Sequence, residues 1–245
     1  MVKRKTPAKM NSLNTSVPLV SWKDVTQIDP MEVTCTTNTV FSAFLRQPEG
    51  HFVHVFIKQP KSSSAQAARA LRHEARSLLK LRGIHGIPHL YGVSRRPKMA
   101  LFMAFTSGGL LGDFLKPQTP RSYLAGILRV CHIMREVHAR GVAHKNLYPC
   151  HVFVEPSLQH DSNLVMVSLA GFSHTALHAT ALDKQYDVDS IATMALEVYE
   201  HIKPPHALYK RRELLLGAQR KDINLKNMEI IVTKVLYGRK PPQYP

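Results

Sequence analysis

Alternation of apolar and polar residues is the main pattern in the first part of the chain. It begins at Trp22, and its later apolar members are Val33, Val40, Phe41, Phe44, Phe52, Val53 and Val55. Pro48-Glu49-Gly50 is a typical turn between two of these runs. Runs of period two that are separated by turn residues are typical of β-strands. We therefore expect a meander of three antiparallel strands that starts at Trp22.

Two later segments place apolar residues at helical spacing. The first, about 65–81, follows Ser62-Ser63-Ser64, which can cap a helix, and its stripe is Ala67, Ala70, Leu71, Leu78 and Leu81. The stripe of the second is Leu124, Ile127, Leu128, Cys131, Met134 and Val137. Both stripes predict helices that bury one face. Arg140-Gly141 ends the second helix, because glycine adopts the left-handed conformation that helix ends often need.

Shorter elements are expected in the rest of the chain. Apolar runs at 152–154 and 164–169 predict strands, and a short helix is expected at about 110–115. A stripe at Val188, Ile191, Ala195 and Val198 predicts a third helix, which we expect to start at about Asp187. Pro204-Pro205 should break that helix. Two further helices are expected at about 207–216 and 227–237.

Glu74 lies on the apolar stripe of the first helix. A carboxylate that faces a hydrophobic core is costly unless a cation meets it. Glu74 is therefore expected to have a buried basic partner. The alternative is that it sits at the edge of the stripe and faces solvent.

Composition places the chain among ordinary globular proteins. It has 245 residues, of which 44% are hydrophobic and 20% charged, which suits one two-lobed domain or two small ones. Its formal net charge of +16 favours nucleic acid, acidic lipid or acidic protein surfaces as partners. The alternative is a basic protein without such a partner, since no nucleic-acid-binding motif is present.

Cysteine usage and the termini bear on the compartment. Cys35, Cys131 and Cys150 are too few and too scattered for a disulfide framework, which favours the cytoplasm or the nucleus. Residues 1–21 form a basic tail that we expect to be flexible, and it lacks the apolar core of a signal peptide. No stretch reaches the ~18 apolar residues of a membrane span.

The loop after the second helix holds the residues that carry chemistry. It reads His144-Lys145-Asn146-Leu147, with His151 four residues further on. This spacing resembles the catalytic loop of protein kinases, H-R-D-L-x-x-x-N. The resemblance implies that Asn146 replaces the aspartate that accepts the substrate proton, and that His151 replaces the asparagine that holds magnesium. A neutral amide takes up no proton at neutral pH, and imidazole prefers softer metals than magnesium.

Other kinase motifs follow the family's order but carry further replacements. Val55-Phe56-Ile57-Lys58 is similar to V-A-I-K, so the resemblance makes Lys58 the expected partner of Glu74 and a contact for nucleotide phosphates. The stretch from Thr34 to Phe41 matches the glycine-rich loop but contains no glycine. Threonine resists the backbone angles that glycine permits, so tight nucleotide binding of the usual kind is not expected.

The resemblance also places a nucleotide hinge. Met103 would be the gatekeeper, and Ala104 and Phe105, with Thr106, would offer backbone groups to an adenine. The alternative for Met103 is an ordinary core methionine. Ser107-Gly108-Gly109-Leu110 is similar to the x-G-G-x-L that opens the larger lobe.

The segment after the predicted strand at 164–169 contains the last positions that resemble kinase motifs. Gly171-Phe172-Ser173 stands where kinases have D-F-G, so the aspartate that holds magnesium is replaced while the packing phenylalanine is present. Asp187 matches the aspartate that holds the catalytic-loop backbone, in a partial match where Asp189 and Ala192 replace the family's tryptophan and glycine. The alternative is an acidic first turn of some other helix. His144, Phe172 and Asp187 are thus expected to be structural. The segment from 174 to 186 is short and has no A-P-E motif.

These patterns predict an α+β, two-lobed, protein-kinase-like fold. A small antiparallel lobe with one helix would span about 22–105, a mainly helical, shortened lobe about 106–238, and a tail 239–245. The expected function is that of a pseudokinase that binds, scaffolds or regulates in signalling. Two alternatives stay open: a weak or unconventional ATP-dependent protein kinase, and a basic nucleic-acid-binding module.

The expected ligands and partners follow from the same replacements. No metal site is expected. His85 and His89 bracket Gly86 and Pro88 and so do not share a regular helix, and Cys150 with His151 lacks spaced companions. ATP would bind without conventional magnesium binding, if it binds. The expected partners are proteins, with an active kinase or an acidic surface as candidates, and no membrane span is expected.

Overall fold

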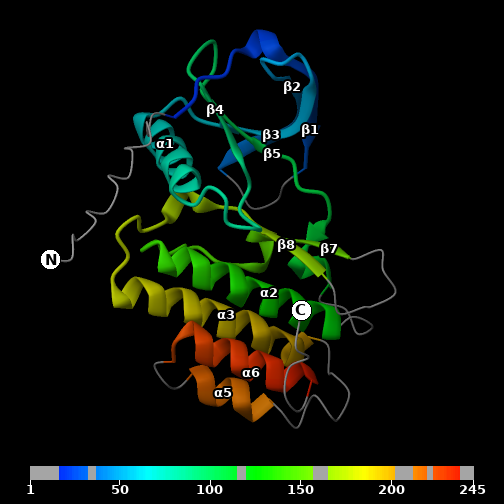
Figure 1. The fold of residues 1–245 in the computed structure, drawn as a ribbon, viewed down its shortest axis with the longest axis vertical. Coiled ribbons are helices and arrows are strands. Elements are labelled where there is room, and N and C mark those ends of the chain that lie inside the picture. The colour runs from blue at the N-terminus through cyan, green and yellow to red at the C-terminus, as the bar shows by residue number, and fades with distance from the viewer. Residues whose placement is uncertain are drawn as a thin grey trace, which may run out of the picture.

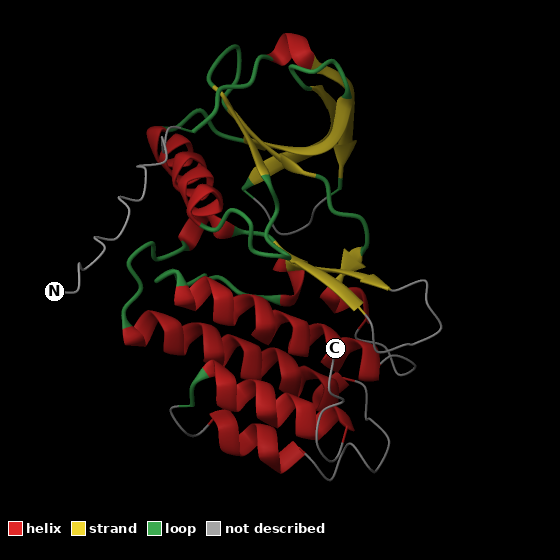
Figure 2. Ribbon diagram, viewed as in Figure 1, coloured by secondary structure: helices red, strands yellow, loops and turns green. Residues whose placement is uncertain are grey.

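A five-stranded antiparallel sheet with one helix lies beside a mainly helical lobe (Figures 1 and 2). The computed structural model describes residues 17–32, 37–114, 120–156, 165–201, 212–219 and 223–237. The arrangement confirms the predicted α+β, two-lobed class. We call the sheet with its helix the N-terminal lobe and the helical part the C-terminal lobe.

The N-terminal lobe is built on a meander, as predicted. Its strands are β1 (Val25–Met31), β2 (Asn38–Arg46), β3 (Phe52–Pro60), β4 (Leu90–Ser94) and β5 (Ala100–Ala104), in the spatial order β1-β2-β3-β5-β4. The first strand starts at Val25 and not at Trp22, so the predicted start was wrong. The Ser21 hydroxyl accepts a hydrogen bond from the Lys23 N–H, which winds Trp22–Asp24 into a 3₁₀ turn.

Helix α1 (Ala65–Lys80) packs against one side of this sheet (Figure 1). The Ser64 hydroxyl caps it by accepting from the Ala67 N–H at 3.1 Å. Its buried residues begin only at Leu71. The predicted stripe was therefore too long at its start, where Ala70 is exposed, because the first turns of α1 lie beyond the covered region.

The C-terminal lobe stacks long helices below a small sheet (Figures 1 and 2). The helices are α2 (Pro120–Ala139), α3 (Ala181–His201), α5 (Arg212–Gln219) and α6 (Leu225–Tyr237). The sheet has the order β6-β7-β8, with β6 (Gly109–Leu110), β7 (Val152–Pro156) and β8 (Val165–Leu169). All six residues of the stripe predicted for α2 are buried.

Short 3₁₀ turns join these elements. They are η2 (Leu111–Phe114), η3 (Pro149–His151) and η4 (Phe172–His174). The first replaces the short helix expected at 110–115. The predicted break at Pro204-Pro205 and the start of the helix predicted at 207–216 lie outside the described residues, as do most of the two tails.

Helix α3 starts six residues earlier than predicted, at Ala181. Thr180 and Asp183 form a capping box: the Asp183 N–H donates to the Thr180 hydroxyl at 3.1 Å, and the Thr180 N–H donates to the Asp183 carboxylate at 3.0 Å. This pair satisfies backbone donors at the helix start. Asp187 therefore lies within the second turn of α3 and does not open the helix.

One hydrophobic cluster runs through both lobes. It extends from Leu71 of α1 through Met103 and Met134 to Val232 of α6. The loop after α1 adds a backbone contact, since the Leu169 N–H of β8 donates to the Gly86 carbonyl at 2.8 Å. The lobes therefore share a core. None of the described helices is long and apolar enough to cross a membrane.

Loss of the capping box should weaken α3. We expect Thr180→Ala to lower the free energy of unfolding by about 1 kcal/mol, because it removes a helix cap. Urea denaturation measures the effect. Ser190→Ala is the control, because its hydroxyl donates to the Tyr186 carbonyl within the same helix and caps nothing. An equal loss of unfolding free energy in the two variants would show that the capping box stabilises α3 no more than an ordinary side-chain hydrogen bond does.

Candidate functional site

A buried ion pair joins the sheet to α1. The Lys58 Nζ of β3 lies 2.9 and 2.7 Å from the two carboxylate oxygens of Glu74, and the two residues are 9% and 2% exposed. The basic partner predicted for Glu74 is present. Because both oxygens accept from one ammonium, the carboxylate is compensated by charge and by hydrogen bonds.

Polar contacts fix the rest of α1 on the segment that follows η4. The His73 ring bonds to the carbonyl and the hydroxyl of Thr175, at 2.8 and 3.1 Å, and the Ser77 hydroxyl bonds to the same hydroxyl. The Lys80 ammonium donates to the Leu177 carbonyl. These contacts join residues about a hundred positions apart in the sequence, so they tie α1 to the segment that precedes α3.

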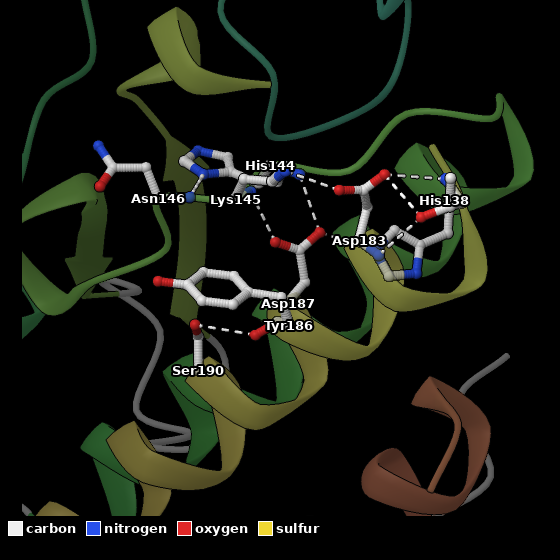
Figure 3. Close-up of polar contacts among 9 residues, drawn as sticks. His138, His144, Lys145, Asn146, Asp183, Tyr186, Asp187 and Ser190 are labelled. Atoms are coloured by element: carbon white, nitrogen blue, oxygen red, sulfur yellow. Dashed lines mark hydrogen bonds and ion pairs between the residues drawn. The ribbon is translucent and has the colours of Figure 1, made fainter. Parts of the chain in front are cut away.

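Asp187 organises the loop at residues 144–151, which we call the His144 loop (Figure 3). Its carboxylate is fully buried and accepts from the Lys145 N–H at 2.7 Å and from the His144 N–H at 2.8 Å. The His138 ring of α2 lies 2.8 Å from the same carboxylate. Three donors from two segments therefore meet one buried charge, which fixes the loop backbone.

Lys145 makes a second link between the His144 loop and α3 (Figure 3). Its backbone takes the left-handed conformation, with φ +61°, and its ammonium lies 2.7 Å from the Asp183 carboxylate. The Lys145 ammonium, and then the N–H and hydroxyl of Thr180, lower the pKa of Asp183 to about 2. Asp183 thus serves both the capping box and the loop.

Two neutral histidines lie inside the site. Burial lowers the pKa of His144 to about 4, although the Asp187 carboxylate acts in the opposite direction. Its Nε2–H donates to the Ala170 carbonyl at 2.9 Å, and its Nδ1 accepts from the Asn146 N–H. Burial also lowers the pKa of His151, against the effect of the Asn146 carbonyl, to which His151 Nδ1–H donates at 2.6 Å.

The His151 ring fills the space beside Gly171. A Cβ atom added at Gly171 would lie 2.7 Å from His151 Cδ2, which is closer than real Cβ contacts allow. Gly171 also has φ +82°, a conformation that glycine adopts at no steric cost. The two positions at which kinases bind magnesium thus pack against each other here. A side chain at position 171 would therefore require the His151 ring to move.

A small apolar cavity lies between the lobes. Its volume is about 100 Å³, whereas pockets for drug-sized ligands measure ~300–1,000 Å³. Phe56 and Met103 line it from the N-terminal lobe, and Phe153 and Leu169 line it from the C-terminal lobe. The ring centroids of Phe56 and Phe153 are 6.0 Å apart. An aromatic ring stacked between them would need a separation of about 7 Å between the two phenyl rings, which is twice the carbon–carbon contact distance.

Stacked rings continue from this cavity to the edge of the N-terminal lobe. Phe56 packs on Phe105 with a centroid distance of 4.5 Å, and Phe105 stacks on His54 at 3.8 Å. The Phe105 N–H donates to the His54 carbonyl, and the Ala104 N–H donates to the His89 carbonyl. The N–H groups of Ala104 and Phe105 are thus used inside the protein, while Thr106 lines the cavity.

Magnesium and a stacked nucleotide do not fit this arrangement. Magnesium requires oxygen ligands, and the two expected ligand positions supply an imidazole and a glycine. Glu74 is already paired with Lys58. Among the described residues, no group of three His, Cys, Asp or Glu side chains is placed to hold a metal ion. The Asn146 side chain carries no proton acceptor strong enough to act as a base.

Sequence reasoning missed the two phenylalanines that close the cavity. One signal was available, because Phe56 stands where V-A-I-K has alanine and its side chain is much larger. No local signal marks Phe153, which reads as an ordinary strand residue. The roles of His138 and Thr175 were also missed, since each depends on a contact with a distant segment.

The Asp187 carboxylate should matter to stability more than other acids of α3. We expect Asp187→Asn to lower the free energy of unfolding by about 2 to 4 kcal/mol, because buried donors lose their anionic acceptor. Asp189→Asn is the matched control on the same helix; Asp189 is exposed and should change stability by less than about 0.5 kcal/mol. Chemical denaturation measures the free energy of unfolding of both variants. Similar losses in the two would contradict the role of Asp187.

Burial of neutral His144 should make stability depend on pH. Its pKa falls from the usual 6.5 to about 4 on folding, so the unfolded chain binds more protons between these values. Stability is then complete above pH 6.5 and falls as the pH drops toward 4, by up to about 3 kcal/mol. Urea denaturation from pH 7 to 4.5 measures the slope. His144→Gln, which cannot titrate, should have a shallower slope; an unchanged slope would contradict the assignment.

The comparison with known proteins agrees with this geometry. The family model for protein tyrosine and serine/threonine kinases matches residues 34–208, which is more than half of the chain. The matched range contains the Lys58–Glu74 pair, the His144 loop and Asp187. No curated protein matches the chain closely enough to count as a relative. With the two-lobed fold and the family match over most of its length, the chain belongs to the protein tyrosine and serine/threonine kinase family.

Proposed function

We propose that this chain is a pseudokinase, a kinase-shaped module that works by binding other proteins and not by transferring phosphate. The packing of His151 on Gly171 is the observation that carries the proposal. An imidazole ring stands at one of the two positions where the family binds magnesium. At the second position, Gly171, a Cβ atom would lie 2.7 Å from that ring.

The losses in chemistry are large. A general base typically contributes 10²- to 10⁴-fold to rate, and Asn146 stands in its place. The metal ions contribute further by neutralising charge on the transferring phosphate, and both of their ligand positions are replaced. Phe56 and Phe153 then fill part of the space in which a nucleotide base would stack.

The parts that support the shape are intact. Lys58 pairs with Glu74, Asp187 holds the His144 loop, and α1 is fixed to Thr175. A module that binds through its surface needs a rigid shape but no reactive groups. We therefore propose that the chain binds or regulates signalling proteins, with an active kinase as one candidate, in the cytoplasm or the nucleus. The proposal includes no conventional use of ATP with magnesium.

Nucleotide titration tests the proposal. A ligand at about 100 times its Kd stabilises a protein by about 2.7 kcal/mol, which raises the Tm of a domain of this size by roughly 5 to 10 °C. We expect ATP, with or without magnesium or manganese, to shift the Tm of the wild-type protein by less than about 1 °C. No phosphate transfer to itself or to a generic peptide is expected.

A variant with an enlarged cavity tests whether the contact between Phe56 and Phe153 is what excludes a nucleotide base. Phe56→Ala removes the ring that meets Phe153, at a cost of about 3 to 5 kcal/mol in stability. If closure excludes the base, ATP should raise the Tm of this variant more than that of the wild type. Phe41→Ala, at a half-buried position of β2, is the control for lost stability. A large wild-type shift with magnesium and ATP, together with phosphate transfer, would overturn the proposal.

A further inference from the structure

Positive charge is concentrated around α1. Residues 58 to 98 contain ten lysines and arginines and a single acidic residue, Glu74. Glu74 is buried against Lys58, so it cannot compensate any charge at the surface. The exposed part of this segment therefore carries positive charge alone.

Three arginines form a row along α1. Arg69, Arg72 and Arg76 are all exposed, and at 100° per residue they lie within about 60° of one another around the helix axis. Leu71, Ala75 and Leu78 occupy the opposite side and are buried. The row, which we call the α1 arginine row, is about 10 Å long and lies on the side of α1 opposite to its buried residues.

The row is costly for an isolated helix. Like charges three or four residues apart destabilise a helix by about 0.2 to 0.5 kcal/mol a pair. The first turn of α1 contains no acidic residue that would favour the helix dipole. Among the ion pairs of the described residues, none involves Arg69, Arg72 or Arg76.

Helix α1, which carries the row, is held firmly in place. Lys58, Thr175 and the Leu177 carbonyl hold the inner side and the end of α1. A partner would therefore meet arginines on a preformed helix and would not have to order the backbone that carries them.

We propose that the α1 arginine row binds an acidic helical segment of a protein partner. This deepens the proposed function, on which it rests, by naming the surface and the class of partner. Carboxylates at positions three and four apart on a helix repeat with the same spacing as the row, and each guanidinium can hold a carboxylate with two hydrogen bonds. Small residues beside the row, Ala65 and Ala70, are exposed and allow a helix to approach closely.

The same features do not favour nucleic acid. Helix α1 contains no Phe, Tyr or Trp. Single-stranded nucleic acids are usually bound by stacking of bases on such rings beside the basic groups. The row therefore offers charge and forked donors but no stacking surface.

Fluorescence anisotropy with defined probes tests the surface. The probes are a labelled alanine-rich helical peptide of about 20 residues with glutamates three and four apart, its glutamine counterpart, and a single-stranded RNA. We expect the glutamate peptide to bind, and the triple variant Arg69→Glu, Arg72→Glu, Arg76→Glu to weaken binding at least about tenfold, or about 1.4 kcal/mol. Replacing the same three residues by lysine should weaken it less, because charge remains but the forked geometry is lost.

A matched control carries the same change in net charge elsewhere. Lys23, Arg121 and Lys226 are exposed and lie outside α1, so their triple replacement by glutamate should change the affinity by less than about threefold. Circular dichroism and the Tm establish that both triple variants fold.

Several results would overturn the inference. These are no binding of the glutamate peptide, equal binding of the glutamine peptide, equal losses in the two triple variants, or RNA binding that is tighter and lost only in the α1 variant. All measurements are made without nucleotide. Phosphate transfer by the wild-type protein would therefore overturn the pseudokinase proposal and leave this result unaffected, and the reverse also holds.

Discussion

The buried carboxylate of Asp187 is the interaction on which the architecture of the site depends. A charge without access to water must be met by hydrogen bonds, and here the donors come from α2 and from two successive backbone amides of the His144 loop. Because those amides must point at α3, Lys145 takes an unusual backbone conformation and His144 turns inward onto the Ala170 carbonyl. The fixed loop then places Asn146 and His151. The shape of the loop is thus maintained by a strut that is independent of any reaction.

Side chains of the protein narrow the cleft between the lobes to a cavity of about 100 Å³. The Lys58–Glu74 pair closes its back, the rings of Phe56 and Phe153 meet across it, and His151 covers Gly171. The two ring contacts take up space between the lobes, while the ion pair fixes α1 on the sheet. The shared hydrophobic core and the contacts between α1 and Thr175 fix the relative position of the lobes. Contacts that stabilise the relative position of the lobes thus lie beside contacts that narrow the cavity between them.

Much of the fold was predictable because it follows from periodicity. The stripe of α2, the three-stranded meander and the need of Glu74 for a cation are local patterns with one physical interpretation. The start of α3 was missed although its signal is local, because Thr180 and Asp183 were not recognised as a capping box. The contact of Phe56 with Phe153 and the packing of His151 on Gly171 could not be predicted in this way. Residues far apart in sequence meet there, and no spacing rule connects them.

The packing of His151 on Gly171 also couples the residue types at these two positions. A change of Gly171 to aspartate alone would drive the new side chain into the imidazole ring. A change of His151 to asparagine alone would remove the ring that bonds to the Asn146 carbonyl and leave a gap beside a glycine. Each single change is thus unfavourable while the other position keeps its present residue. The side chains at positions 151 and 171 therefore constrain each other, and a larger residue at one position requires a compensating change at the other.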